Sequence, residues 1–174
     1  MDKQTNRTIQ LSIISTCPPR QMSLLIDTWQ TIRQTGIESE LIWLAEHNNV
    51  PEQSYPDLRI VNLNKRSDRN GCWQAGLHMA RSSKRLLISH FTPALSQRTC
   101  SGIARVLKHP QAPSSRLSYL RQRLASLAVL HGQYQLTMSL LPMCLIDYDS
   151  LLKARRDLPQ HWYQYFKGYH LSSV

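Results

Sequence analysis

The chain has 174 residues, a length that fits one domain with a hydrophobic core better than two. Hydrophobic residues make up 41% of it and charged residues 18%, which excludes a disordered chain. There is no apolar run of about eighteen residues, and the polar N-terminus lacks the apolar core of a signal peptide. We therefore expect a cytoplasmic protein, peripheral at most to the inner membrane surface.

Lysine and arginine total 21 against 11 acidic residues, which gives a formal charge of +10. Such a charge attracts phosphate-bearing small molecules, an anionic membrane surface or nucleic acid, although a basic face can also be merely solvated. The four cysteines form no CxxC pair, so the sequence predicts reduced, buried thiols and no zinc site.

The first half of the chain alternates apolar, β-rich runs with amphipathic segments. Between residues 20 and 36, apolar residues recur at intervals of three and four, which is typical of a helix, and Gly36 ends it. We expect strands at residues 9–16, 38–47, 56–64 and 84–91, and helices at 20–36 and within 70–83.

Strands that alternate with helices predict an α/β fold with a mainly parallel sheet flanked by helices. In such sheets, ligands bind beyond the carboxyl ends of the strands. The loops to inspect are therefore those that follow strands, namely "TCPPR", "AEHNN" and "SHFTP".

The second half of the chain is less regular. We expect a short helix at 98–110 and a longer helix at 115–132, then a strand within 134–154 that leads into a helix near Tyr148. In the longer helix one side carries leucines and the other tends toward arginines. The leucines are Leu117, Leu120, Leu124, Leu127 and Leu130, and the arginines are Arg116, Arg121 and Arg123.

Several stretches, in this order, resemble family-2 glycosyltransferases with a GT-A fold: "LSIISTCPPR", "ELIWLAEHNN", "LRIVNLN" and "NGCWQAGLHMARSSKRLLISHFTP". In the last, "NGCWQAGLHMA" before an apolar strand resembles the glycine-containing pattern that precedes the family's acidic motif. Later, "MCLIDYDSLLKARRDL" and "WYQYFKGYHLSS" resemble its acceptor-side segment. The resemblance implies a single GT-A-like domain over 1–174, with a nucleotide-sugar-binding half at 9–96 and a truncated acceptor-side half at 97–174.

That family uses an Asp-x-Asp to hold a divalent cation, which neutralises the diphosphate leaving group of the donor. Here the corresponding positions are His90, Phe91 and Thr92. Histidine can ligate a metal, but Mg²⁺ prefers carboxylates, and a partly buried histidine at a strand end is the plainer reading. The sequence therefore predicts neither a metal site nor a Mg²⁺ or Mn²⁺ cofactor.

A carboxylate after the second strand holds the nucleobase in that family, and its paired acids fall here on Ala45 and Glu46. Glu46 can accept a hydrogen bond from a base, or it is a solvated loop acid. The family's acceptor-side Glu-Asp falls near Tyr169 and His170, so His170 is a candidate general base or simply an exposed residue.

Two further readings concern "DYD", Asp147 to Asp149, and Trp73. The two acids suit a metal site, with Asp149 as a candidate catalytic residue, but their place at a strand-to-helix junction favours a helix cap. Trp73 can stack on a sugar or a base, but core packing is favoured. The C-terminal aromatics are the other stacking candidates: Trp162, Tyr163, Tyr165 and Phe166.

The resemblance implies donor-binding residues Thr16, Glu46, Arg69, His90 and Thr92. Without a metal, basic side chains must neutralise the diphosphate, and the candidates are Lys65, Arg66 and Arg69.

Three functions remain open. The first is sugar transfer from a nucleotide-sugar donor, without a metal. The second is an inactive pseudoenzyme of that fold that serves as a binding or assembly subunit with a protein partner. The third is a basic protein that binds nucleic acid or an anionic membrane surface.

Overall fold

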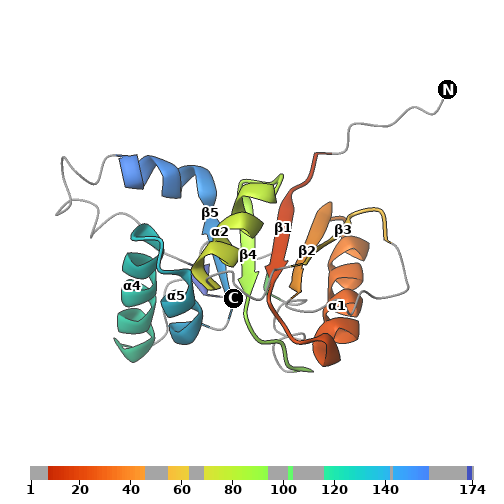
Figure 1. Cartoon of the computed structure of the whole chain (residues 1–174), viewed down its shortest axis with the longest axis horizontal. Helices are drawn as coiled ribbons and strands as arrows, with labels where there is room; N and C mark the ends of the chain where they lie inside the picture. Colours follow the sequence, from red (N-terminus) through yellow and green to blue (C-terminus); the bar gives the residue numbers. More distant parts are fainter. Residues whose placement is uncertain are drawn as a thin grey trace.

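The computed structural model describes residues 8–45, 55–62, 69–93, 102–103, 116–141, 143–156 and 172–173. They form a six-stranded sheet in the order β3-β2-β1-β4-β5-β6 (Figure 1). Its strands are β1 (Leu11–Ser15), β2 (Ser39–Ala45), β3 (Leu58–Asn62), β4 (Lys84–Ile88), β5 (Met143–Asp147) and β6 (Ser172–Ser173). The helices are η1 (Pro19–Gln21), α1 (Met22–Gln34), α2 (Arg69–Met79), α4 (Arg116–Leu130) and α5 (Tyr134–Leu140), and a further helical segment spans 148–156.

The sheet confirms the predicted α/β class. Strands β1 to β4 are parallel to one another, whereas β5 runs antiparallel to β4 and β6 antiparallel to β5. The central strands β1 and β2 are buried along their whole length, because helices cover both faces of a parallel sheet.

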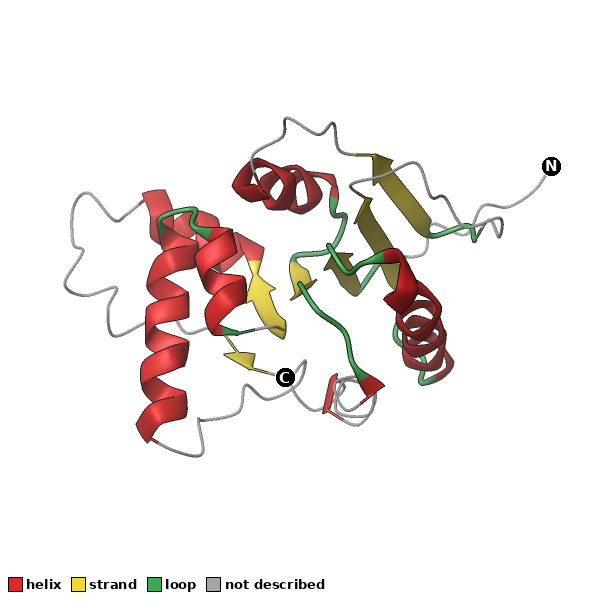
Figure 2. Cartoon of the chain, turned by 60° about the horizontal axis from the view of Figure 1, so that its bottom comes forward, coloured by secondary structure: helices red, strands yellow, loops and turns green. Residues whose placement is uncertain are grey.

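Two hydrophobic clusters lie on opposite faces of the sheet. In β1, Ile13 contributes to the cluster under α1, while its neighbour Ile14 contributes to the cluster under α2, α4 and α5. This follows from the strand, whose successive side chains point to opposite faces. Figure 2 shows α1 and α2 on the two sides of the strands.

The predicted helix at 20–36 is confirmed as η1 and α1. Its three-four spacing matches the buried face, which includes Leu25, Trp29 and Ile32. Gly36 follows the helix with a φ of 87°, a conformation that L side chains rarely adopt, so glycine ends the helix as expected.

Helix α2 lies unusually close to the sheet at Gly76. A Cβ at this position would lie 2.7 Å from Cγ2 of Ile14 and 3.1 Å from Cδ1 of Leu44. At the carboxyl end of the helix, the buried Arg85 guanidinium donates to the carbonyl oxygens of Leu77 and Ala80. The Leu77 carbonyl also accepts from the Ala80 N–H at 3.4 Å, and Arg85 adds charged donors to both carbonyls, so it caps the helix.

The same guanidinium makes two further contacts. Its Nε donates to the carbonyl oxygen of Ser82 at 2.9 Å, and its Cζ lies 3.4 Å from the centroid of the Tyr148 ring. Burial lowers the pKa of Arg85, and the neighbouring Tyr148 acts in the opposite direction.

The segment from residue 134 corrects one expectation. We predicted a strand leading into a helix near Tyr148, but residues Tyr134–Leu140 form helix α5 before the strand β5 begins. The buried residues Tyr134, Thr137 and Met138 have helical spacing, which the apolar composition of the segment obscures. The helix near Tyr148 is confirmed at 148–156.

Helix α4 is confirmed, but its leucines divide between two environments. Leu130 is buried, whereas Leu120 and Leu124 are more than half exposed. The residues that α4 turns inward include Gln122, Ser126 and Val129. The predicted helix at 98–110 falls almost entirely outside the described residues, as do the C-terminal aromatics Trp162, Tyr163, Tyr165 and Phe166.

Candidate functional site

The strand order creates a crevice at one edge of the sheet. From β1 the chain moves outward to β2 and β3, and then returns to place β4 on the other side of β1. At such a reversal the loops after the two strands diverge and leave room for a ligand. Thr16 follows β1 and Ser89 follows β4, so these two residues mark the crevice.

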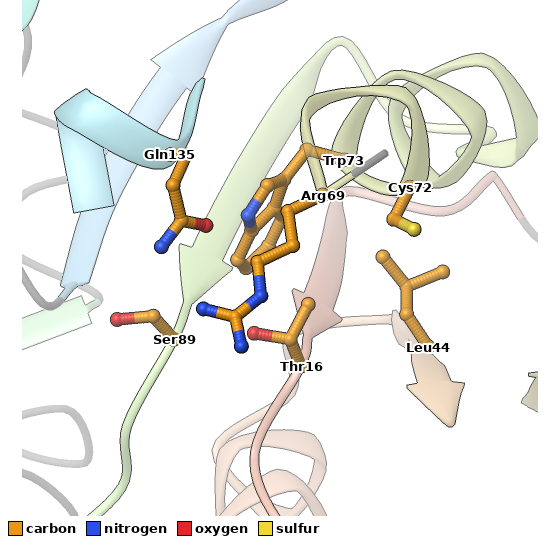
Figure 3. Close-up of a pocket in the computed structure, with 7 residues that line it drawn as sticks. All are labelled: Thr16, Leu44, Arg69, Cys72, Trp73, Ser89 and Gln135. Carbon is orange, nitrogen blue, oxygen red and sulfur yellow. The ribbon is translucent and has the colours of Figure 1, made fainter. Parts of the chain in front are cut away.

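A pocket of about 200 Å³ occupies this position. Thr16, Leu44 and Ser89 come from the ends of β1, β2 and β4, and the rest of the lining comes from α2 and α5 (Figure 3). The helix residues are Arg69, Cys72, Trp73 and Gln135. In Figure 3 the Arg69 side chain reaches toward the strand ends, and Gln135 faces it from α5. We call this cavity the carboxyl-edge pocket.

A second cavity of about 240 Å³ adjoins the first. Thr16 and Leu44 line both, so they form the boundary between two lobes. The second lobe is the more apolar and is lined by Cys17, Pro18, Pro19, Trp43 and Ala45. Trp43 is fixed there, because its indole N–H donates to the carbonyl oxygen of Cys17 at 2.9 Å.

Arg69 gives the carboxyl-edge pocket a positive charge. Its side chain is exposed, and none of the described residues that line the pocket is a carboxylate. Within the described part of the chain, Arg69 forms no ion pair. The charge is therefore available to an anion from solution.

Arg69 begins a long basic stretch of the sequence. From Arg69 to Ile146 the chain contains no acidic residue and ten lysines and arginines. The other eleven basic residues are balanced by the chain's eleven acids, so the whole net charge of +10 belongs to this segment. We call it the acid-free segment.

The loop after β1 is held by two hydrogen bonds to β4 and one within the loop. The Thr16 N–H donates to the carbonyl oxygen of Ile88 at 3.2 Å, and the Ser15 hydroxyl donates to the same oxygen at 3.0 Å. The Ser15 oxygen also accepts from the Cys17 N–H at 3.1 Å. These bonds hold Thr16 at the boundary of the two lobes.

Gln21 holds the loop after β4. Its Oε1 accepts from the Phe91 N–H at 2.9 Å, so its amide nitrogen is the group that lies 3.3 Å from Nδ1 of His90. Nδ1 then acts as the acceptor, which places the ring proton of neutral His90 on Nε2. Nothing in the sequence pattern singles out Gln21, because its partners lie about seventy residues away.

Asn70 positions the two helices that face each other across the pocket. Its Oδ1 accepts from the Gln135 N–H at 2.9 Å, which satisfies an amide in the first turn of α5. Its Nδ2 lies 3.3 Å from Oε1 of Gln133. Asn70 thereby links the start of α2, where Arg69 lies, to the start of α5.

The described acids outside α1 gather at the opposite edge of the sheet. Glu40 is buried near the amino end of β2, and Asp147 ends β5 beside Lys84, the first residue of β4. Asp147 accepts from the Ser150 N–H at 3.2 Å and from Lys84 Nζ at 2.5 Å. The predicted helix cap is confirmed, and the exposed Asp149 lies beside it at this edge.

The residues after β4 do not fit a divalent cation. Phe91 is 1% exposed and belongs to the core cluster under α1, and Thr92 is a poor ligand for Mg²⁺. Within the described ranges, no three histidine, cysteine or acidic side chains lie close enough together to hold a metal. We therefore derive no step through a metal at this site.

The structure brings together two of the predicted donor-binding residues, Thr16 and Arg69. His90 and Thr92 follow Ser89 on the same loop, but they do not line the pocket. Two other predicted site residues, Glu46 and His170, lie outside the described residues. The candidate catalytic residue Asp149 is described, but it lies at the opposite edge of the sheet. Lys65 and Arg66 also lie outside the described residues.

The predicted burial of Trp73 and of three of the four cysteines is confirmed, and Cys100 lies outside the described residues. Trp73 is 1% exposed and belongs to the core, although one side of it lines the pocket. Cys17, Cys72 and Cys144 are buried free thiols, and burial raises the pKa of Cys144 to about 12. Burial also raises the pKa of Cys17, against the opposing effect of the Ser15 hydroxyl.

No protein-family model matches the chain, and its sequence matches no curated protein. Among the helices of the described residues, none is both long enough and apolar enough to span a membrane.

Proposed function

We propose that the chain is a glycosyltransferase-like protein that binds a nucleotide-sugar donor in the carboxyl-edge pocket, with Arg69 in place of a metal ion at the diphosphate. One observation carries the proposal: an exposed guanidinium lies in a pocket at the reversal of strand order, and the described residues of its lining include no carboxylate. Arginine presents parallel donors that match two oxygens of a phosphate group.

The two lobes suit the two ends of such a donor. Each lobe alone is smaller than a typical ligand site, but together they reach the usual range of about 300–1,000 Å³. The base fits the apolar lobe beside Pro18 and Trp43, and the diphosphate fits the lobe with Arg69. The hydroxyl groups of Thr16 and Ser89 add hydrogen-bonding capacity in the phosphate lobe.

Sugar transfer would place new negative charge on the departing diphosphate, and Arg69 would stabilise that charge electrostatically. The acceptor hydroxyl needs a base, for which His170 remains the predicted group. Asp149 cannot serve a ligand in this pocket, because it lies at the opposite edge of the sheet.

The position of the acids favours a second candidate function, a binding subunit that holds a nucleotide sugar without transferring it. The two acids of "DYD" lie away from the pocket. Asp147 accepts hydrogen bonds from Lys84 and from the Ser150 N–H of the 148–156 helix. Both candidate functions share the same donor site. They differ only in whether the bound sugar is released or transferred.

Thermal unfolding of the chain with a panel of UDP- and GDP-sugars tests the donor site. A donor that binds only the folded state stabilises it by an amount that rises with the logarithm of the donor concentration above Kd, and we expect the same shift in EDTA as in Mn²⁺. Release of free nucleotide from the shifting donor, with or without an added acceptor, distinguishes a transferase from a binding subunit. If no nucleotide sugar shifts the thermal unfolding transition, the proposal of a donor site is wrong.

Arg69→Gln is the sharper variant. It removes a charged hydrogen bond worth about 2 kcal/mol, so we expect donor affinity to fall roughly thirtyfold by calorimetry. Arg121→Gln is the matched control, because it removes one charge from the same acid-free segment but lies on α4. Equal affinities for the two variants would contradict the role of Arg69.

A further inference from the structure

Helix α4 turns large apolar side chains toward solvent. Leu120 is 57% exposed and Leu124 is 54% exposed, although leucine usually packs inward in water. Its buried side carries Ala125, Ala128, Val129 and Leu130 together with the polar Gln122 and Ser126. Helix α4 therefore carries apolar side chains on two sides, one against the core and one toward solvent, unlike an ordinary surface helix with a single apolar face.

The outer side of α4 has a regular arrangement. Leu120 and Leu124 are four residues apart, so they lie one above the other on the helix. With about 100° per residue, Arg121 lies about 60° to one side of this pair and Arg123 about 60° to the other. Arg121 is exposed and Arg123 is half-buried. We call these four residues the leucine stripe.

The charged residues of α4 have one sign. Helix α4 contains no acidic residue, and it lies within the acid-free segment that carries the whole net charge. A surface that combines exposed leucines with flanking arginines complements a partner that is apolar beneath an anionic layer. An anionic lipid bilayer has this composition.

We propose that the leucine stripe docks α4 onto the surface of an anionic lipid bilayer, with Leu120 and Leu124 inserted between headgroups and the exposed Arg121 at the lipid phosphates. Nucleic acid would pair with the arginines but would leave both leucines in water. A second copy of the chain would bring arginines of the same sign together across the contact.

The leucine stripe is separate from the carboxyl-edge pocket. In both Figure 1 and Figure 2, α4 lies at the rim of the molecule, with α5 beside it on the side of the sheet. The residues of the stripe do not line either lobe. Docking and donor binding can therefore be tested independently.

Flotation of the full chain with lipid vesicles tests the proposal. One set contains phosphatidylcholine alone, and the other contains one third phosphatidylserine. We expect the chain to float with the anionic vesicles only, and added salt to reduce the bound fraction. Changing Leu120 and Leu124 together to serine should lower the partition coefficient at least tenfold, and Arg121→Gln should lower it about fivefold.

Two control variants accompany these. Leu152→Ser removes an exposed leucine from the 148–156 helix, and Arg69→Gln removes a charge from the pocket. We expect both to float as the unchanged chain does. Thermal unfolding of each variant shows that it is folded, which is expected because the substituted side chains are exposed.

Three results would overturn the proposal. The first is equal binding to neutral and anionic vesicles, and the second is unchanged binding by the double serine variant. The third is an absence of vesicle binding. If the chain does not bind vesicles but is retained on DNA, and the leucine substitutions do not change that retention, the basic residues bind nucleic acid. If the chain is instead a dimer that the leucine substitutions dissociate, the leucine stripe is an interface with a second copy.

Discussion

The two edges of the sheet use charge in opposite ways. At the amino edge, the carboxylates of Glu40 and Asp147 are each held by a basic side chain and a backbone N–H. At the carboxyl edge, the described residues that line the pocket provide a guanidinium, two hydroxyl groups and an amide, but no carboxylate. The described acids outside α1 lie at the amino edge instead.

The charged groups at the amino edge stabilise the fold, whereas the guanidinium at the carboxyl edge is available to a ligand. Glu40 connects four segments, because it accepts from the Ser12 hydroxyl at 2.6 Å, from Arg59 and from the Arg81 N–H at 2.7 Å. Its bonds are made entirely within the protein. Arg69 has no such partner among the described residues, so an anion can bind there without displacing an internal ion pair.

The largest effect should come from Glu40→Gln. The side chain is 1% exposed, and the change leaves the Arg59 guanidinium, which is 28% exposed, without its carboxylate. We expect the free energy of unfolding to fall by about 3 kcal/mol, measured by urea denaturation. Donor affinity should be unchanged in the fraction that remains folded.

Glu38→Gln is the matched control for Glu40. Its carboxylate lies 4.0 Å from Arg33 and is 38% exposed, so we expect a loss of less than about 1 kcal/mol. Equal losses for Glu38 and Glu40 would show that burial at the amino edge does not decide the contribution of its carboxylates.

The two glycines of α2 offer a second contrast. Gly76→Ala places a methyl group 2.7 Å from Cγ2 of Ile14, and we expect it to cost about 1–3 kcal/mol. Gly71→Ala meets no atom within 4 Å, and we expect it to stabilise the chain by about 0.5–1 kcal/mol. Thermal unfolding of both variants measures the difference. The same sign for both would contradict the close approach of α2 to β1.

The smallest expected effect is the contribution of Asp147 to the free energy of unfolding, which is lost at acidic pH. Burial acts to raise the pKa of Asp147, but the bonds to Lys84 and Ser150 outweigh it and lower the pKa below its ordinary value of 3.8. This stabilisation is complete above 3.8 and is lost as the pH falls through the lower folded-state pKa.

Asp147→Asn removes that pH dependence. We expect a loss of about 1 kcal/mol at neutral pH, since Lys84 and Asp147 are each more than a third exposed, and a smaller loss at pH 3. Urea denaturation at the two pH values measures it. A loss that grows on acidification would contradict the lowered pKa.

Much of the fold could be predicted from local pattern. The runs that became β1 and β2 are apolar and β-rich, and Gly36 marks the end of α1. The orientation of α4 could not be predicted, because it depends on which side α5 covers. Residues 134–140 are apolar enough to suit a strand, and their helical state depends partly on Asn70, more than sixty residues earlier.

The candidate site could be predicted where it depends on chain order. Thr16 follows the first strand, so chain order places it at the carboxyl edge, whereas Arg69 was expected from the family resemblance, and both line the pocket. Gln21 and Gln135 were missed, because an amide acquires its role only from partners that folding brings to it. Partners that are distant in the sequence produce no recognisable residue spacing.

The cap that Arg85 forms on α2 has a consequence for the other end of that helix. Aligned peptide dipoles give a helix a partial negative charge at its carboxyl end and a partial positive charge at its amino end. The buried Arg85 charge compensates the negative end, where it binds the carbonyls of Leu77 and Ala80. The macrodipole of α2 therefore presents its positive end, beside Arg69, to whatever occupies the pocket.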